Sequence, residues 1–146
     1  MSIPFYSART IVEEKVQAYL ATALTGVAVH KGITPETKVI PLVTVYAKSS
    51  RAADALGSHP YGNYMVTLEI GIYSSADDDT LDTHRTRVQT VQNYMADTSA
   101  LKALWTLGTD GLLYDLWVTQ DEEGMHQRKY GNLLEYTVFV MLPPSP

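Results

Sequence analysis

The densest cluster of residues that could do chemistry lies at residues 77–84. It reads Asp-Asp-Asp-Thr-Leu-Asp-Thr-His, and clustered carboxylates with a histidine can bind a hard metal ion or a metal with mixed ligands. The same residue types suit the start of a helix, where the dipole favours acids and an Asp or Thr side chain, Asp79 for example, caps free N–H groups. The spacing lacks the glycine and the distal glutamate of a calcium loop. We therefore interpret the cluster as a helix start and expect no metal.

Other reactive residue types are scattered along the chain. The histidines are far apart, none stands in an H-E-x-x-H spacing, and each is expected to lie in a loop or on the surface: His30, His59, His84 and His126. A serine triad assembled from distant positions stays open, but the chain has no G-x-S-x-G elbow and no glycine-rich phosphate loop. We expect no enzymatic activity, no catalytic residue and no cofactor.

Composition limits the classes of partner. The chain has 146 residues, no cysteine and a formal net charge of −5. Without cysteine there is no disulfide framework and no thiolate zinc site. An acidic chain with scattered Lys and Arg is a poor tight binder of duplex DNA, because such binding depends on neutralising phosphates. The first ten residues do not have the pattern of a signal peptide, and no apolar run reaches the ~20 residues of a membrane span.

Helical patterns occupy two main segments. Residues 10–24 show capping-box spacing between Thr10 and Glu13, then apolar residues at steps of three and four, with Gly26 placed for a left-handed cap. Residues 81–97 carry a narrow apolar stripe of Leu81, Val88, Val91 and Met95. A short further helix is expected at residues 100–107, capped by Thr98 or Ser99 and carrying Trp105.

Strand patterns occupy four segments. Residues 39–47 are rich in β-formers, although Pro41 restricts them to an edge or a strand start. Residues 64–73 and 133–142 alternate regularly, and the latter is apolar on both faces, as in a central strand. Residues 112–119 are expected to place Leu112, Tyr114, Leu116 and Val118 on one face. Residues 30–38, 48–63 and 120–127 are expected to be loops.

This order predicts an α+β fold. We expect an antiparallel, possibly mixed sheet of about four strands with the two main helices packed on one face. Residues 1–142 would form a single domain and residues 143–146, Pro-Pro-Ser-Pro, a C-terminal tail. The second sheet face would remain partly apolar, which hints at oligomerisation.

The order of elements also resembles a known family. A leading helix is followed by a loop with Pro and Gly, by a strand, and by the alternating strand that ends at Tyr73-Ser74. A helix over residues 83–95 follows, and the last strand contains Tyr-Thr-Val-Phe-Val at residues 136–140. This pattern, which covers most of the chain but contains no diagnostic motif, resembles the tail-terminator or tail-completion proteins of long-tailed bacteriophages.

The resemblance implies a structural virion protein of the tail or neck, assembled in the host cytoplasm. It implies a ring, hexameric in that family, that contacts the tail tube protein on one side and the head–tail connector or stopper protein on the other. DNA would pass through the channel without tight binding. From the expected loops we predict the interface residues to be Lys48, Arg51, His59, Tyr61, Asp121, Glu122, Glu123, Arg128 and Lys129.

Three alternatives remain open from the sequence. The chain could be another phage assembly component, such as a neck or head-completion protein, which sequence patterns barely separate from a tail terminator. It could be a small-ligand-binding domain or enzyme with an unrecognised pocket near residues 77–84 or His59. It could also be an interaction module of a cellular protein.

Overall fold

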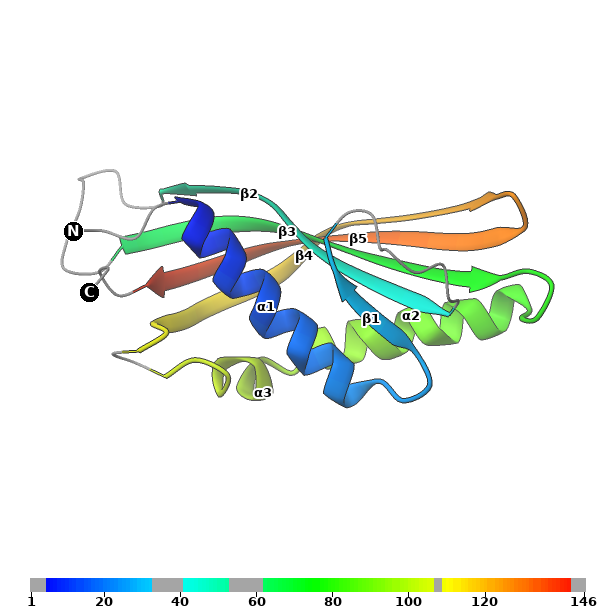
Figure 1. The fold of residues 1–146 in the computed structure, drawn as a ribbon, viewed down its shortest axis with the longest axis horizontal. Coiled ribbons are helices and arrows are strands. Elements are labelled where there is room, and N and C mark those ends of the chain that lie inside the picture. Colours follow the sequence, from blue (N-terminus) through cyan, green and yellow to red (C-terminus); the bar gives the residue numbers. More distant parts are fainter. Residues whose placement is uncertain (1–4, 33–40, 53–61, 107–108, 143–146) are drawn as a thin grey trace.

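The computed structural model describes residues 5–32, 41–52, 62–106 and 109–142 (Figure 1). The elements of these residues are α1 (Phe5–Ala23), β1 (Ala28–Lys31), β2 (Leu42–Ala52), β3 (Gly62–Ser75), α2 (Leu81–Ala96), α3 (Thr98–Lys102), β4 (Leu112–His126) and β5 (Lys129–Leu142). The predicted tail, residues 143–146, lies outside the described residues.

The strands form one mixed sheet in the order β1-β2-β3-β5-β4. β1 pairs with β2 in parallel, and the other pairs are antiparallel. The predicted α+β class is confirmed, and β5 is a central strand as expected. The described sheet has five strands instead of about four, because β1 falls partly in the expected loop 30–38. Four residues are too few to show a strand periodicity in the sequence.

Both main helices lie on the same face of this sheet (Figure 1). Over most of their length, every second residue of β3 and β5 is apolar and points into the layer between the sheet and the helices. This packing removes apolar surface from water and supplies most of the folding energy. Figure 1 shows α1 crossing the sheet and α2 running beside it along the lower edge. The buried residues include Val12, Val16 and Leu20 of α1, Val88, Val91 and Met95 of α2, and Leu68, Ile70, Leu134 and Val138 of the sheet.

Helix α1 begins earlier than the sequence suggests. Its first residue is Phe5, so Thr10 lies within the helix and the predicted capping box is not used. A capping motif acts only where the chain before it is not helical, and here the preceding residues extend the helix. At the other end the helix stops at Ala23, and Gly26 has the expected positive φ of 73°.

The start of α2 is fixed by a threonine. Thr80 is the N-cap, and its hydroxyl accepts the backbone N–H of Thr83 at 3.1 Å. Asp97 caps α3 in the same way by accepting from the N–H of Ala100 at 3.1 Å, so the prediction of Thr98 or Ser99 was wrong. The third helix ends at Lys102, and the buried Trp105 follows it in the chain.

Parts of two expected loops are strand. β2 continues through Ala52, and β4 continues through His126, so residues 49–52 and 120–126 pair with their neighbours. The hairpin between β4 and β5 turns at Gln127 and Arg128, whose φ values are 48° and 64°. Positive φ at both positions matches the twist of a two-residue hairpin. Gly124, in the expected loop 120–127, lies inside β4.

The prediction that Leu112, Tyr114, Leu116 and Val118 share one face of β4 is wrong. The buried residues of the strand are Leu113 and Leu116, whereas Tyr114 and Val118 are exposed. Pairing with β5 shifts between Leu113 and Asp115 and again between Val118 and Gln120. Each β-bulge inserts an extra residue and reverses the alternation that follows it, which a strict period of two cannot anticipate.

Candidate functional site

The acidic cluster at residues 77–84 is arranged as a helix start. Asp82 lies in the first turn of α2, just after the N-cap Thr80, where the helix dipole stabilises a negative charge. Asp79 does not cap; its carboxylate lies 3.3 Å from Nη1 of Arg87. Asp77 pairs with Arg128 of the β4–β5 turn. Within the described ranges, no three acidic or histidine side chains are grouped closely enough to hold a metal ion.

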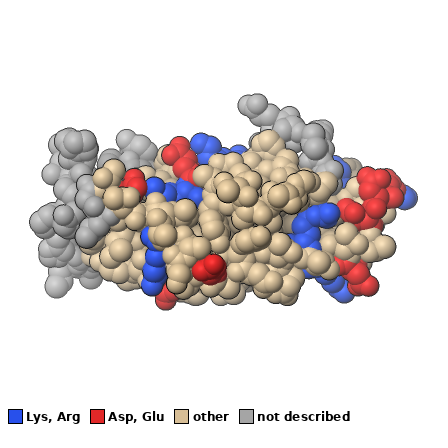
Figure 2. Space-filling model, turned by 90° about the horizontal axis from the view of Figure 1, so that it is seen from below, with Lys and Arg blue, Asp and Glu red and all other residues tan. Residues whose placement is uncertain are grey.

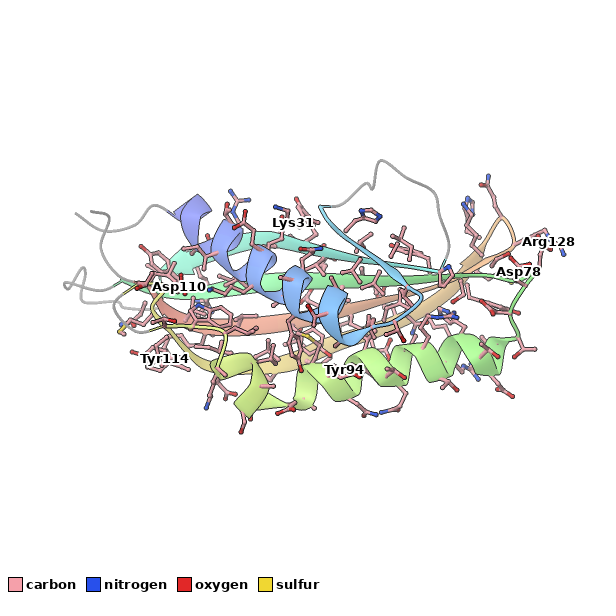
Figure 3. The ribbon with its side chains drawn as sticks, turned by 60° about the horizontal axis from the view of Figure 1, so that its bottom comes forward. Lys31, Asp78, Tyr94, Asp110, Tyr114 and Arg128 are labelled. Carbon is pink, nitrogen blue, oxygen red and sulfur yellow. The ribbon has the colours of Figure 1, made fainter. Side chains whose placement is uncertain are left out.

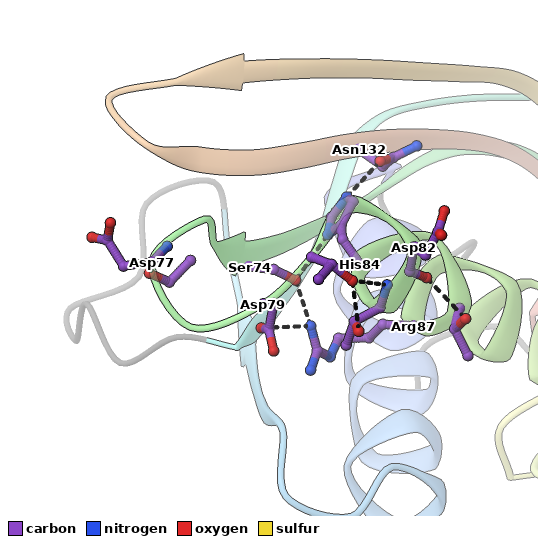
Figure 4. Close-up of polar contacts among 11 residues, drawn as sticks. Ser74, Asp77, Asp79, Asp82, His84, Arg87 and Asn132 are labelled. Carbon is purple, nitrogen blue, oxygen red and sulfur yellow. Dashed lines mark hydrogen bonds and ion pairs between the residues drawn. The ribbon is translucent and has the colours of Figure 1, made fainter.

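His84 is not a surface residue, contrary to the sequence prediction. It is fully buried on the inner face of α2, between the ends of β3 and β5. Its Nδ1 lies 2.8 Å from Oγ of Ser74, and its Nε2 lies 2.7 Å from Oδ1 of Asn132 (Figure 4). The sequence carried a signal for this placement, because His84 stands three residues after Leu81 and four before Val88 on the same stripe.

The hydrogen bonds extend from His84 in two directions. On one side, the guanidinium of Arg87 donates to Oγ of Ser74 and pairs with Asp79. On the other, Nδ2 of Asn132 donates to Oδ1 of Asp121 at 2.9 Å. We call this chain of contacts the His84 network. It connects β3, α2, β5 and β4 at the end of the sheet where the hairpin turns.

A Ser–His–Asn series invites comparison with a nucleophile and its base, but burial opposes it. Ser74 and His84 have no exposed surface and Asn132 is 5% exposed, so a substrate has no approach to the Ser74 hydroxyl. With the proton on Nε2, a neutral His84 donates to Asn132 and accepts from Ser74, which satisfies all three groups. The arrangement therefore works as a structural connection between elements.

Charged side chains around this network pair within the chain. Arg85 donates to both carboxylate oxygens of Glu123, at 3.0 and 2.8 Å. That hydrogen bond lowers the pKa of the Glu123 carboxyl and raises the pKa of the Arg85 guanidinium. The hydrogen bond from Arg128 to Asp77 likewise raises the pKa of the Arg128 guanidinium. Figure 3 shows Asp78 and Arg128 at this end of the molecule, whereas Asp110 and Tyr114 lie at the other end.

The nine residues predicted to make interfaces are not grouped in one place. Lys48 and Arg51 lie exposed on β2, and Lys48 is 3.7 Å from Glu135 of β5. The acids at residues 121–123 lie on β4, while Arg128 and Lys129 lie at the hairpin turn and the start of β5. His59 and Tyr61 lie outside the described residues. For all nine residues, contact with another molecule stays a prediction.

The sheet face away from the helices carries aromatic and sulfur-containing side chains that are exposed or half-buried. Tyr114 is 37% exposed and packs on Phe139 with ring centroids 4.7 Å apart. Its hydroxyl lies 3.3 Å from the sulfur of Met141, and Met65 pairs with Phe139 across β3 and β5. We call Met65, Tyr114, Phe139 and Met141 the aromatic patch.

A second surface feature lies beside the edge strand β4, on the side of the sheet that carries the helices. A groove of about 450 Å³ runs between α2 and β4. Its floor includes Tyr136, and burial, followed by the charge of Asp121, raises the pKa of the Tyr136 hydroxyl to about 12. Val118, 51% exposed, lies at the outer wall. We call this the neutral groove, because every residue that lines it is uncharged: Gln89, Gln92, Asn93, Met95, Ala96, Thr98, Leu116, Trp117, Val118 and Tyr136.

Comparisons with known proteins assign no family. No protein-family model and no curated protein matches the chain. Among solved structures, the chain is similar to one described as the virion of a native gene transfer agent particle, with a TM-score of 0.45 and 13% identity. The similarity covers 94% of this chain and 92% of that one. Likeness at this level carries no argument about function. In the described part of the chain, no helix is long and apolar enough to span a membrane.

Proposed function

We propose that this protein is a structural component of the virion of a tailed bacteriophage. In this proposal its copies form a hexameric ring at the end of the tail tube. The ring joins the tube to the head connector, and DNA passes through its channel without tight binding. The proposal gives the chain no catalytic role. It rests on the resemblance in element order and on a half-covered sheet.

The observation that carries the proposal is the sheet face that α1 and α2 leave open. Tyr114 is 37% exposed on this face, where it packs on Phe139. Trp117 is 40% exposed on the edge strand β4 and also lines the neutral groove. Aromatic residues are enriched in the cores of protein interfaces, and a contiguous exposed apolar patch marks an interaction site. A chain that keeps such a face uncovered has the surface that a subunit of an assembly needs.

The charged end of the molecule suits the remaining contacts of a ring. The hairpin carries Asp121, Glu122 and Glu123 on β4 and the bases Arg128 and Lys129 at its turn and on β5. Polar and charged residues are typical of interface rims and of contacts that form on encounter. In this proposal they meet the tail tube or the connector, and the acids that face the channel repel DNA.

The test is the native mass of the purified protein over a concentration series, together with electron micrographs of any assembly. The proposal predicts a closed ring with an open centre and no gel shift of duplex DNA at physiological salt. A monomer at every concentration, with no ring when tail tubes are added, would overturn it.

A further inference from the structure

The outer half of α2 is unusual for a solvent-facing helix. Its charged residues, Asp82, Arg85 and Arg87, all lie in the first half, and residues 88–96 contain none. Soluble surfaces ordinarily mix charges of both signs, whereas the buried centres of interfaces are depleted of them. The middle of the face seen in Figure 2 is mostly tan, interrupted by one acidic group, with further acidic and basic side chains towards the two ends.

The neutral groove beside this half-helix combines amides with apolar groups. Gln89, Gln92 and Asn93 form its α2 side, and Leu116 and Val118 form its β4 side. The amide of Gln89 donates to Asn93 at 2.9 Å, so part of the rim is already ordered. A groove with an apolar wall and a few hydrogen-bonding groups can seat aromatic or thioether side chains.

The aromatic patch supplies side chains of that kind on the opposite side of the sheet. Its members are uncharged, but the exposed Asp115 pairs directly with Phe139 across β4 and β5, and its carboxylate accepts the backbone N–H of Leu116 at 2.8 Å. β3, β4 and β5 contain 14 or 15 residues each. At ordinary strand rise and spacing their whole open face extends roughly 46 Å by 14 Å, about 640 Å², and it includes Glu69 and Glu135 beyond the patch. The patch occupies one end of this face, so a contact of the ~800 Å² that a stable interface buries on each partner also takes in surface around the patch.

We propose that the neutral groove of one copy of this chain receives the aromatic patch of the next copy. This inference rests on the proposed ring and names the surfaces that form it. The residues named for the two surfaces are uncharged, and the Asp115 carboxylate beside Phe139 keeps the backbone N–H of Leu116 as a partner when water is removed. The two surfaces lie on different sides of one sheet, so the contact is heterologous and repeats from copy to copy until the ring closes.

Direct strand pairing between copies is disfavoured at the same edge. β4 is interrupted by two bulges and carries three consecutive acids at residues 121–123. Bulges and charges on an edge strand are the features that prevent another strand from adding to a sheet. The contact between copies therefore runs through side chains on the two faces of β4 and not through its backbone.

The test uses one variant of each surface and a mixture of the two. Val118→Asp places a charge in the groove, and Tyr114→Asp places one in the patch; both positions are partly exposed. Gln92→Lys and Tyr114→Lys are second variants for the case of a folding defect. Ala21→Glu, on the exposed side of α1, is the control for an added surface charge. Thermal melts establish that each variant is folded.

Native mass measurements should give monomers for each surface variant alone and a ring for the control. An equimolar mixture of groove and patch variants should give a dimer and nothing larger, because one intact groove and one intact patch remain. Rings from either folded variant, or a mixture that stays monomeric, would overturn the assignment of surfaces while the ring itself stands. A parent protein that never associates, even when tail tubes are added, would overturn both proposals.

Discussion

The two halves of α2 face the same solvent with different chemistry. In the first half, Arg85 and Arg87 are bonded to acids of the same chain, and His84 is enclosed by Ser74 and Asn132. In the second half, residues 88–96 are uncharged and border a groove with the exposed Val118 on its far side. The first half satisfies its polar groups within the subunit. The second half presents uncharged side chains, mainly amides, beside a groove whose apolar wall comes from β4.

The two halves of α2 are expected to differ in role: the first half contributes to the stability of the subunit, and the second half to the contact between copies. Changes near the His84 network should lower the free energy of unfolding and leave the contact between copies unchanged. Changes at the exposed residues of the neutral groove, such as Val118, should do the reverse, whereas its buried floor residue Tyr136 contributes to stability. The predictions below follow this division, from the largest expected effect on stability to the smallest.

Replacing His84 with alanine should cost the most. The change removes a fully buried ring and leaves Ser74 and Asn132 without their partner, so we expect a loss of about 3 kcal/mol in unfolding free energy. Urea unfolding measures it, with Thr22→Ala on the exposed surface of α1 as the control. A loss no larger than that of the control would mean that the network does not join the elements as described.

Replacing Tyr136 with phenylalanine should alter the dependence of stability on pH. An ordinary tyrosine loses its proton near pH 10, but in the folded chain the pKa of Tyr136 is raised to about 12 by burial and by Asp121. The unfolded chain therefore ionises first, so stability is fully present below pH 10 and falls between pH 10 and 12, by at most about 3 kcal/mol.

Unfolding midpoints between about pH 9 and pH 11.5 test this. The Tyr136→Phe variant should lose less stability over that window than the parent, although Tyr19 and Tyr64, whose pKa values are also raised by burial, still contribute. Equal slopes for both proteins would contradict the assignment.

Replacing Thr80 with alanine should remove the N-cap of α2 at a cost of about 1 kcal/mol. Thr80→Ser keeps the hydroxyl and should retain most of the stability. If the alanine and serine variants melt together, the hydroxyl does not act as the cap.

Replacing Arg85 with alanine should change stability least. Its pair with Glu123 lies at the surface, where water and salt screen the attraction. We expect a melting temperature within error of the parent at physiological salt. A clear loss would show that the hairpin depends on this pair as well as on the Asn132–Asp121 contact.

The regular parts of the fold were predictable because their periodicity is uninterrupted. The alternation of Val66, Leu68, Ile70 and Ile72 predicts β3, and the stripe of Val88, Val91 and Met95 predicts the buried face of α2. The two bulges of β4 were not predictable, because an inserted residue leaves no mark in a sequence that remains rich in β-formers. The hairpin turn was missed because Gln127 and Arg128 lack the Asn-Gly signal of such turns.

The site was predictable only in part. The acids of residues 77–84 were correctly assigned to a helix start, but His84, like the other histidines without a paired spacing, was expected in a loop or on the surface. Its partners, Ser74 and Asn132, are distant in sequence and meet it only through the pairing of β3 with β5. The neutral groove likewise depends on β4 lying beside α2, which the order of strands decides.

Hydrogen–deuterium exchange of the monomeric and assembled protein tests the comparison most directly. The account predicts new protection on assembly in residues 88–96 of α2, at Leu116–Val118 of β4 and around the aromatic patch. The hairpin residues 121–129 should exchange alike in both forms. Protection confined to the hairpin and absent from the neutral groove would contradict the account.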